Sequence, residues 1–315
     1  MNAIRLLPDT ARKGARPISA SGWTHKGDTG MMARALLATV AVLALAACVR
    51  ADSAAVQRGG HDSRHPTIVS LNPCSDAVLT QVADKGQILA LSHYSMDPRS
   101  SSMDVAQARR FASTGGTAEE VMALQPDVVI AGSFLPPATR AAFERLGMRV
   151  EVLGLARTVK DSVAQVRDVA RIAGYPDRGE KLVARIEQAL DRAAPPPAAR
   201  PVDAVMWQSG GIVPGANVLV SDLLRHTGFA SHSVRRGLGQ ADVLPLEQVL
   251  SDPPQVIFAA GTPGDGENRM LHHPALEALA GTRHAAFAPG LLYCGGPSLI
   301  RAVDRLSDVR RSVTP

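Results

Sequence analysis

The chain has 315 residues, enough for two modest α/β domains, with a formal net charge of +5 at pH 7 and only 3% aromatic residues. Four of the five surplus positive charges fall within residues 1–47, so the rest of the chain is nearly neutral and its charge does not indicate a nucleic-acid partner.

The first 66 residues have the pattern of an export signal followed by a tether. An apolar run over 35–47 follows a polar, basic stretch and is too short to span a membrane stably. Small residues precede Cys48, as in the lipobox of bacterial lipoproteins, so we expect a lipidated Cys48 that anchors a periplasmic protein to the membrane. Cleavage after one of the preceding alanines, which would release a soluble periplasmic protein, is the alternative. Residues 1–47 are thus predicted to be an N-terminal extension and signal peptide, and residues 48–66 the lipidated cysteine and a flexible tether.

Residues 67–157 alternate between short apolar runs and helical segments. The runs are rich in Val, Ile and Leu and have the length of strands buried on both faces. Strands that alternate with helices indicate a parallel sheet with right-handed crossovers, so this region is predicted to be an N-terminal α/β lobe. The predicted strands are 67–71, 88–91, 128–131 and 149–152, and the predicted helices are 76–83, a short helix opened by Glu119, and 137–146.

Residues 158–199 are predicted to be connector helices. Apolar residues recur at helical spacing through 158–173 and again through 177–193, with a break at Gly174-Tyr175-Pro176 between the two segments. A run of three prolines from Pro195 ends the second helix, because proline cannot continue the helical hydrogen bonds. We expect the second, long helix to be a rigid connector between two lobes.

Residues 200–315 are predicted to be a C-terminal lobe, because they repeat a pattern of the first. Glu119 and Glu247 each open a short helical stretch, and in both cases a Val, a Pro and a buried-strand run follow at the same spacing. One helix-to-strand unit used twice implies two similar α/β lobes, and a cleft between two lobes is a natural place for a ligand. The other predicted elements of this lobe are strands 203–207, 256–260 and 285–288 and helices 221–226, 246–250 and 298–309.

The combination resembles the periplasmic binding proteins of ABC importers for iron-siderophores, haem and vitamin B12. It comprises Asn72-Pro73 after the first strand, the run 88–92, Gly115-Gly116, the run 124–130 and the repeat at Glu247, and it covers roughly residues 66–312. The resemblance implies two Rossmann-like lobes with parallel sheets, joined by one long connector helix. The ligand is then expected between the lobes, at the carboxyl ends of the strands.

The same resemblance implies that one Glu on each lobe docks onto Arg residues of the membrane permease. Glu119 and Glu247 occupy the matching positions. The alternative is that each is a solvated first-turn Glu, favoured there by the helix dipole.

The loops that follow the predicted strands carry the candidate ligand-binding residues. Aromatic residues are scarce in this chain, yet several fall in these loops, and aromatic faces suit a large flat ligand such as a corrin, porphyrin or catecholate. Packing inside the second lobe is the alternative for Trp207, and simple solvation is the alternative for His93. The predicted ligand-binding residues are Cys74, Ser75, His93, Tyr94, Ser133, Phe134, Trp207, Gln208, Tyr293 and Cys294.

Cys74 and Cys294 follow equivalent strands of opposite lobes, and three roles are open to them. They could form a disulfide across the cleft, contact the ligand or its metal, or be inert small residues. A bridge needs Cα atoms within about 7 Å of each other, which an open ligand-holding cleft does not readily allow, so ligand contact is favoured.

The sequence does not carry the motifs of an enzyme. It has no G-x-G-x-x-G after the first strand, no P-loop lysine, no G-x-S-x-G elbow, no H-E-x-x-H and no paired C-x-x-C. We therefore expect no catalysis and no intrinsic cofactor or metal centre.

The expected function is that of a monomeric periplasmic component that captures a corrinoid or ferric chelate and delivers it to an ABC permease and its ATPase. A corrinoid is favoured because the loop Ser92-His93-Tyr94-Ser95 resembles the B12-binding branch. A ferric siderophore or haem is the alternative ligand, and a bare-metal binding protein or a sensor lipoprotein is the alternative function.

Overall fold

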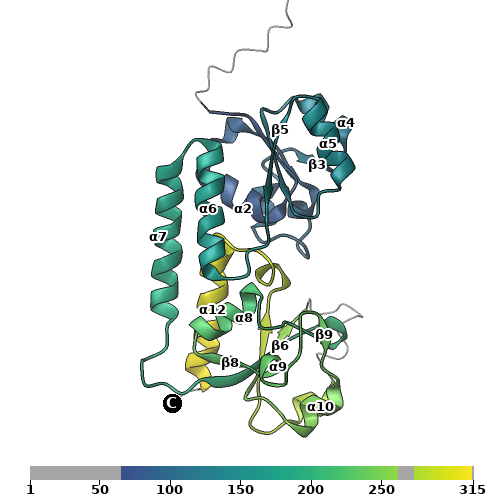
Figure 1. The fold of residues 1–315 in the computed structure, drawn as a ribbon. Coiled ribbons are helices and arrows are strands. Elements are labelled where there is room, and N and C mark those ends of the chain that lie inside the picture. Colours follow the sequence, from purple (N-terminus) through teal and green to yellow (C-terminus); the bar gives the residue numbers. More distant parts are fainter. Residues whose placement is uncertain (1–64, 262–272, 314–315) are drawn as a thin grey trace, which may run out of the picture. The chain divides into compact units, whose positions relative to one another are not determined.

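The computed structural model describes residues 65–261 and 273–313 (Figure 1). The predicted signal peptide and Cys48 lie outside this part of the chain. The strands of the first sheet are β1 (Ile68–Ser70), β2 (Ile88–Ser92), β3 (Ser113–Thr114), β4 (Val128–Gly132) and β5 (Arg149–Leu153). The strands of the second sheet are β6 (Val202–Gln208), β8 (Phe229–Ser231), β10 (Val256–Ala260) and β11 (Arg283–Phe287), and β7 (Ile212–Val213) and β9 (Asp242–Val243) form a separate antiparallel pair.

Helices connect and cover these strands. The α-helices are α2 (Pro73–Val82), α3 (Val105–Ala108), α4 (Ala118–Leu124), α5 (Pro137–Arg145), α6 (Val159–Ala173), α7 (Pro176–Ala193), α8 (Leu219–His226), α9 (His232–Arg235), α10 (Leu246–Ser251), α11 (Pro274–Glu277) and α12 (Ser298–Val313). Short 3-10 turns are η1 (Lys85–Gln87), η2 (His93–Met96), η3 (Ser209–Gly211) and η5 (Pro289–Leu291). We call the first sheet with α2–α5 the first lobe, and the second sheet with α8–α12 the second lobe.

Both sheets are parallel, as the alternation of strands and helices predicts. The strand order is β3-β2-β1-β4-β5 in the first sheet and β11-β10-β6-β8 in the second. The predicted α/β class with two parallel-sheet lobes is confirmed. In the first sheet the order reverses between β1 and β4, and open α/β sheets place ligands outside the carboxyl ends of the strands at such a reversal.

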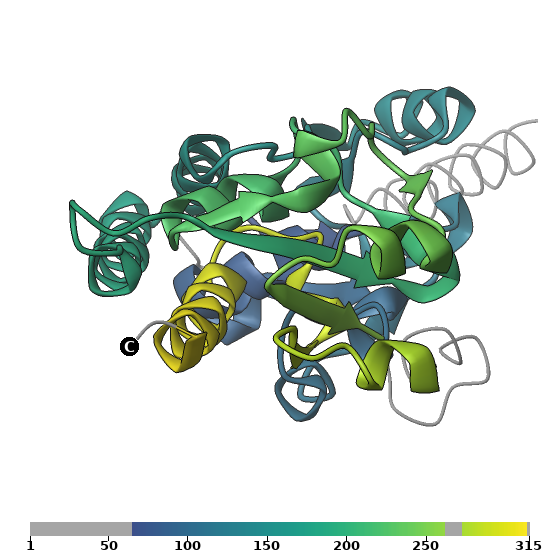
Figure 2. The same cartoon turned by 90° about the horizontal axis from the view of Figure 1, so that it is seen from below.

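One continuous hydrophobic cluster links the two sheets. One face of each sheet packs against apolar side chains of α2, α6, α7, α8 and α12. Helix α12 packs against α7, beside which it lies in Figure 2, although more than a hundred residues separate the two helices in the chain. Because burial of apolar surface is the main favourable term in folding, this shared cluster joins the lobes into one unit.

Two smaller clusters cover the opposite faces of the sheets. Val121 of α4 and Phe143 of α5 pack on the first sheet, and Val249 of α10 and Leu276 of α11 pack on the second. The helices α4 and α10, which carry Glu119 and Glu247, therefore hold corresponding positions in the two lobes.

The chain passes from β5 to β6 through two helices. Val163, Val166 and Ala170 lie on the buried face of α6, and α7 packs against both α6 and α12. The prediction that one long helix joins the lobes is not confirmed, because α6 and α7 together lie between the sheets in the chain and both belong to the shared cluster.

Candidate functional site

A cleft of about 940 Å³ opens at the carboxyl ends of the first sheet. The segments after β1, β2, β4 and β5 form most of it, and the first turns of α4 and α5 complete the first-lobe side. Among the described residues that line it, Tyr293 and Gly295 come from the second lobe. The lining residues are Leu71, Asn72, Pro73, Cys74, Tyr94, Gly115, Gly116, Thr117, Ala118, Glu119, Ala131, Gly132, Ser133, Phe134, Leu135, Pro136, Ala138, Thr139, Ala142, Leu153, Gly154, Leu155, Ala156, Gln165, Tyr293 and Gly295.

Large apolar side chains line this cleft and remain open to solvent. Phe134 is 81% exposed, Tyr293 is 65% exposed, Leu155 is 60% exposed and Tyr94 is 51% exposed. Exposed apolar groups gathered at one place are typical of a binding surface rather than of random surface composition. The predicted contacts Tyr94, Phe134 and Tyr293 are thus brought together, with the predicted Ser133 beside Phe134.

The lining is almost free of charge. Of the described lining residues, Glu119 alone carries a charged side chain, and it lies on the first turn of α4. The neighbouring Glu120 instead bonds the loop before α4, because its carboxylate accepts hydrogen bonds from the Thr114 hydroxyl and the Gly115 N–H, both at 2.7 Å. These hydrogen bonds hold the pKa of Glu120 below its ordinary value, because they stabilise the ionised form.

The turn that presents Tyr94 is fastened to α2 by a buried carboxylate. Asp76 accepts hydrogen bonds from the Ser92 N–H (3.0 Å) and the Ser95 hydroxyl (2.6 Å), which flank Tyr94. Burial disfavours the charged form and raises the pKa of Asp76 to about 7, although these hydrogen bonds act in the opposite direction. Its Oδ1 is buried and has no hydrogen-bond partner among the described residues.

His93 lies beside the cleft rather than in its lining. Its ring is exposed and lies 4.1 Å from the ring of Tyr94, centroid to centroid. The ring of Tyr94 is therefore the member of this loop that faces the cleft, and His93 supports it from the side.

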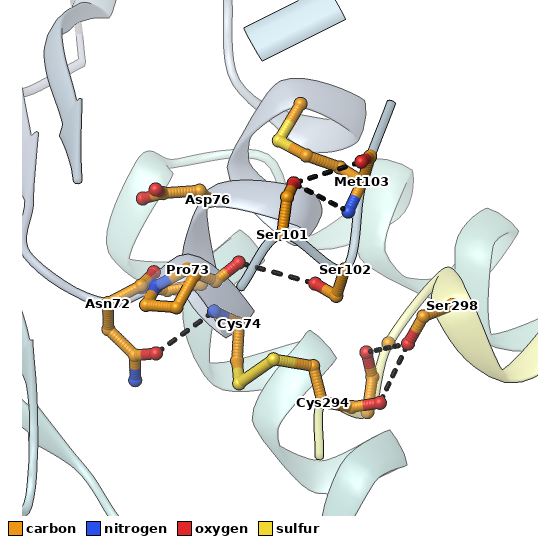
Figure 3. The surroundings of a disulfide bond; sticks show 12 residues. Asn72, Pro73, Cys74, Asp76, Ser101, Ser102, Met103, Cys294 and Ser298 are labelled. Carbon is orange, nitrogen blue, oxygen red and sulfur yellow. Dashed lines mark hydrogen bonds between the residues drawn. A yellow bond between two sulfur atoms is a disulfide. The ribbon is translucent and has the colours of Figure 1, made fainter. Parts of the chain in front are cut away.

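The disulfide Cys74–Cys294 joins the two lobes at the cleft (Figure 3). Cys74 belongs to the first turn of α2, where Asn72 caps the helix and accepts a hydrogen bond from the Cys74 N–H at 2.9 Å. The Cα atoms of the two cysteines are 5.0 Å apart, well within bridging range. The expectation that an open cleft keeps them apart was wrong, because the lobes meet at this point while the cleft opens beside it.

Three predicted contacts are corrected by their burial. Cys294 is 4% exposed and its sulfur is bonded to Cys74. Ser75 is 1% exposed, because its position in the first turn of α2 directs the hydroxyl to Asn72 O and Ser70 Oγ, each at 2.9 Å. Neither residue is available to a ligand in this structure.

Trp207 is the third correction, since its side chain is fully buried in the second lobe. Alternate residues of a strand point to opposite faces, so Trp207 shares a face of β6 with Val205 and packs in the cluster under α10 and α11. Its indole N–H donates to Leu244 O at 3.2 Å. The neighbouring Gln208 is outside the lining but reaches it indirectly, because its Oε1 accepts a 2.6 Å hydrogen bond from the Tyr293 hydroxyl.

Sequence reasoning missed the segment after β5. Leu155 and its neighbours Gly154 and Ala156 line the cleft, as does Gln165 of α6, whose side-chain amide donates to Gly154 O at 2.6 Å. The strand was predicted at 149–152, so the rule that ligands gather at strand carboxyl ends would have found Leu155 had it been applied to this strand.

The described residues contain neither a candidate membrane span nor a cluster of metal-binding side chains. No helix among them is both long and apolar enough to cross a membrane. Within residues 65–261 and 273–313 there is also no group of three or more His, Cys, Asp or Glu side chains placed to hold a metal ion.

Solved structures of several proteins share this fold. The periplasmic haem-binding protein RhuT from Roseiflexus sp. RS-1, in its apo form, has a TM-score of 0.64 at 19% identity, over 78% of this chain and 98% of that one. The periplasmic vitamin B12-binding protein BtuF of Vibrio cholerae has a TM-score of 0.60 at 19% identity, over 79% and 98%. The periplasmic haem-binding protein HutB of Vibrio cholerae has a TM-score of 0.65 at 16% identity, over 78% and 98%.

Two comparisons of the sequence itself accompany these similarities in fold. No curated protein sequence matches the chain. The family model described as periplasmic binding protein matches residues 68–285, which span most of both lobes. The chain therefore belongs to the periplasmic binding protein family.

Proposed function

We propose that this protein is the ligand-binding component of an ABC import system, which captures a metal chelate in the periplasm and delivers it to a membrane permease. The cleft carries this proposal. Its volume of about 940 Å³ is at the upper end of ordinary small-molecule sites, and its exposed rings offer flat apolar surface. A large, flat ligand would cover Tyr94, Phe134 and Tyr293 together. Family membership and similarity in fold to haem- and B12-binding proteins support the same reading.

A corrinoid is our first choice of ligand, and the charge of the cleft favours it. The described lining offers Glu119 as its charged side chain and no Lys or Arg. A polyanionic ferric siderophore needs cationic partners when it leaves water, because burying an unpaired charge is costly. A corrinoid presents its corrin plane and neutral amides, which the aromatic and backbone groups of this cleft can accept.

Haem or a ferric siderophore is the second choice. Phenol side chains are known ligands of haem iron, and Tyr94 and Tyr293 both line the cleft. In the same cleft the tyrosines could ligate the iron of a ferric chelate, and the uncharged lining could contact the neutral surface of a corrinoid. A bare-metal binding protein or a sensor lipoprotein remains the further alternative, distinguished by binding of the free ion or by binding without import.

Delivery is proposed to use Glu119 and Glu247. Both side chains are exposed on the first turns of α4 and α10, which hold corresponding positions on the two lobes. Their exposed carboxylates are open to an Arg of a permease. Lipidation of Cys48 would keep the protein beside that permease in the membrane.

The test is a calorimetric titration of the purified full chain with cyanocobalamin, cobinamide, haemin and a panel of ferric siderophores. We expect one-to-one binding of a corrinoid with a dissociation constant of roughly 1 µM or tighter. Phe134→Ala should weaken it about tenfold, since the ring is exposed in the free protein and buried by the ligand. Leu146→Ala, which truncates an exposed apolar residue outside the cleft, is the matched control and should leave affinity unchanged.

Other outcomes separate the alternatives. Tight binding of haemin or a ferric siderophore alone would keep the transport role and replace the ligand. Binding of none of these compounds would refute the proposed function.

A further inference from the structure

The loop between β11 and α12 is embedded in the rest of the molecule. A Cβ on Gly290 would lie 2.2 Å from Ser101 O, and a Cβ on Gly295 would lie 2.2 Å from Ser162 Oγ. Any larger side chain at these two glycines would therefore push the loop away from the first lobe and from α6. The Gly296 N–H also donates to Ser162 Oγ at 2.7 Å.

Tyr293 stands at the centre of this loop and is held at two points. Its hydroxyl donates to Gln208 Oε1 at 2.6 Å, while the next residue, Cys294, is bonded to Cys74 of the first lobe. The ring between these points remains 65% exposed and lines the cleft, and its partial desolvation raises the pKa of the Tyr293 phenol. The position of the ring thus depends on both attachments.

The second lobe reaches the cleft through this segment. Among the described lining residues, only Tyr293 and Gly295 belong to the second lobe, and Cys294 lies between them. The disulfide therefore joins the middle of the second-lobe wall directly to Cys74, which is itself part of the first-lobe wall.

We propose that the Cys74–Cys294 disulfide is a positioning element of the ligand site, which holds Tyr293 and its loop against the first lobe as the second-lobe wall of the cleft. The inference rests on the proposed function, because it assigns the bridge a role in ligand affinity. The bridge keeps its two Cα atoms 5.0 Å apart, so the lobes cannot separate at this edge and the ring is ordered before the ligand arrives. A wall ordered in advance raises affinity, because the ligand does not bear the entropy cost of ordering it.

A simpler role for the bridge is stabilisation of the fold. It links residues 220 positions apart, and closing so long a loop restricts the unfolded chain. Stabilisation alone predicts a lower melting temperature without the bridge and an unchanged affinity for the folded protein. Positioning predicts a loss of affinity that depends on Tyr293, and the two roles can be separated on that basis.

The experiment compares the full chain with three variants, at a temperature where each is folded. They are the double variant Cys74→Ser/Cys294→Ser, the single variant Tyr293→Ala, and the triple variant that carries all three substitutions. The probes are cyanocobalamin and haemin. Removing the bridge should weaken binding of the probe about tenfold, mainly through faster dissociation. In the Tyr293→Ala background the same change should have little further effect, since both changes remove the same ordered wall. An unchanged affinity without the bridge, or fully additive losses, would overturn the proposal.

A ligand-free measurement tests the same inference. Hydrogen exchange of residues 291–297 should rise when the bridge of the folded wild-type protein is reduced with a phosphine, while β10 should stay protected. Unchanged exchange in 291–297 would count against positioning even if no probe binds, so failure of the proposed function and failure of this inference remain distinguishable. Reduction of the folded wild-type protein also serves if the serine variant does not fold.

Discussion

At the scale of single residues, Asp76 is unusual because it is a buried carboxylate without a cationic partner among the described residues. Its carboxylate is fully buried, one of its oxygens has no partner among the described residues, and the other holds the turn that carries Tyr94. A buried oxygen without a hydrogen bond costs free energy of folding. The hydrogen bonds that the other oxygen accepts from Ser92 and Ser95 offset that cost and hold the turn in place. The hydrogen bonds from Ser92 and Ser95 to Asp76 thus tie the turn that carries Tyr94 to α2.

This environment predicts a dependence of stability on pH. The pKa of Asp76 is raised to about 7 from an ordinary 3.8, so between these values the folded protein binds a proton that the unfolded chain has released. The contribution of Asp76 to the free energy of unfolding is therefore fully present at low pH and is lost as pH rises toward 7 and above, by up to ~3 kcal/mol between pH ~5 and ~8. Denaturant titrations at the two pH values should show this loss.

The variant Asp76→Asn should reduce the pH dependence, because an amide does not titrate in this range. Asp304→Asn, which changes an exposed carboxylate on α12, is the control and should keep the wild-type slope. A wild-type slope in Asp76→Asn as well would show that other groups cause the effect.

The residue scale is also where sequence reasoning was weakest. The positions of Tyr94, Phe134 and Tyr293 at strand ends were predicted, because strand carboxyl ends can be found from apolar runs. Ser75 and Trp207 were misplaced, because a residue at the end of a strand or in the first turn of a helix can point to the cleft or to the core. A shift of one residue in the position of the element changes whether a side chain points to the cleft or to the core. Sequence periodicity places the ends of elements only to within a few residues.

At the scale of elements, the sequence predicted the long, apolar pieces and missed the short, polar ones. The strands β4 and β10 carry continuous apolar runs preceded by Pro, and both were predicted at the observed positions. The strands β3, β8 and β9 have two or three residues each, too few for a periodic signal, and their places depend on tertiary pairing. The disulfide was left open for a related reason, since the distance between two lobes is not encoded in local pattern.

Helix α10 is short and depends on contacts from outside it. It has six residues and no side-chain cap at its N-terminus. The Arg236 side chain, from outside the helix, donates hydrogen bonds to Asp252, the residue that follows α10, at 2.8 Å and to Gln248 within α10 at 3.2 Å. Arg236→Ala should raise hydrogen exchange in residues 246–251 and lower global stability by ~1 kcal/mol or less, the usual range for partly exposed ion pairs.

The matched control is Arg140→Ala, which breaks the exposed ion pair between Arg140 and Glu144 on α5. It should leave exchange in 246–251 unchanged. Equal effects of the two variants on that segment would contradict a specific role for Arg236.

At the scale of the whole molecule, α4 and α10 lie at opposite ends of the two-lobed part that the structure describes, both on the side away from α7 (Figure 1). If Glu119 and Glu247 dock onto a permease, reversing either charge should lower import strongly, and reversing Glu247, which lies outside the lining, should leave ligand affinity in solution nearly unchanged. Import of labelled cyanocobalamin into cells that carry Glu119→Arg or Glu247→Arg measures the first quantity, and titration measures the second.

Two comparisons make this test decisive. Glu187→Arg places the same change on the exposed face of α7 and should import normally. Because Glu119 also borders the cleft, the ligand affinity of Glu119→Arg must be measured alongside its import. Glu247 is outside the lining, so a loss of import by Glu247→Arg reports on docking alone. Normal import by both docking variants would rule out the proposed contact.

The burial of Trp207 gives the protein an internal optical reporter. The chain has two tryptophans, and the other, Trp23, lies in the segment predicted to be removed on export. In a processed chain the emission of the single indole would come from the interior of the second lobe, where water does not reach it. A strongly coloured tetrapyrrole in the cleft would absorb that emission by energy transfer, so ligand occupancy would be visible without a label.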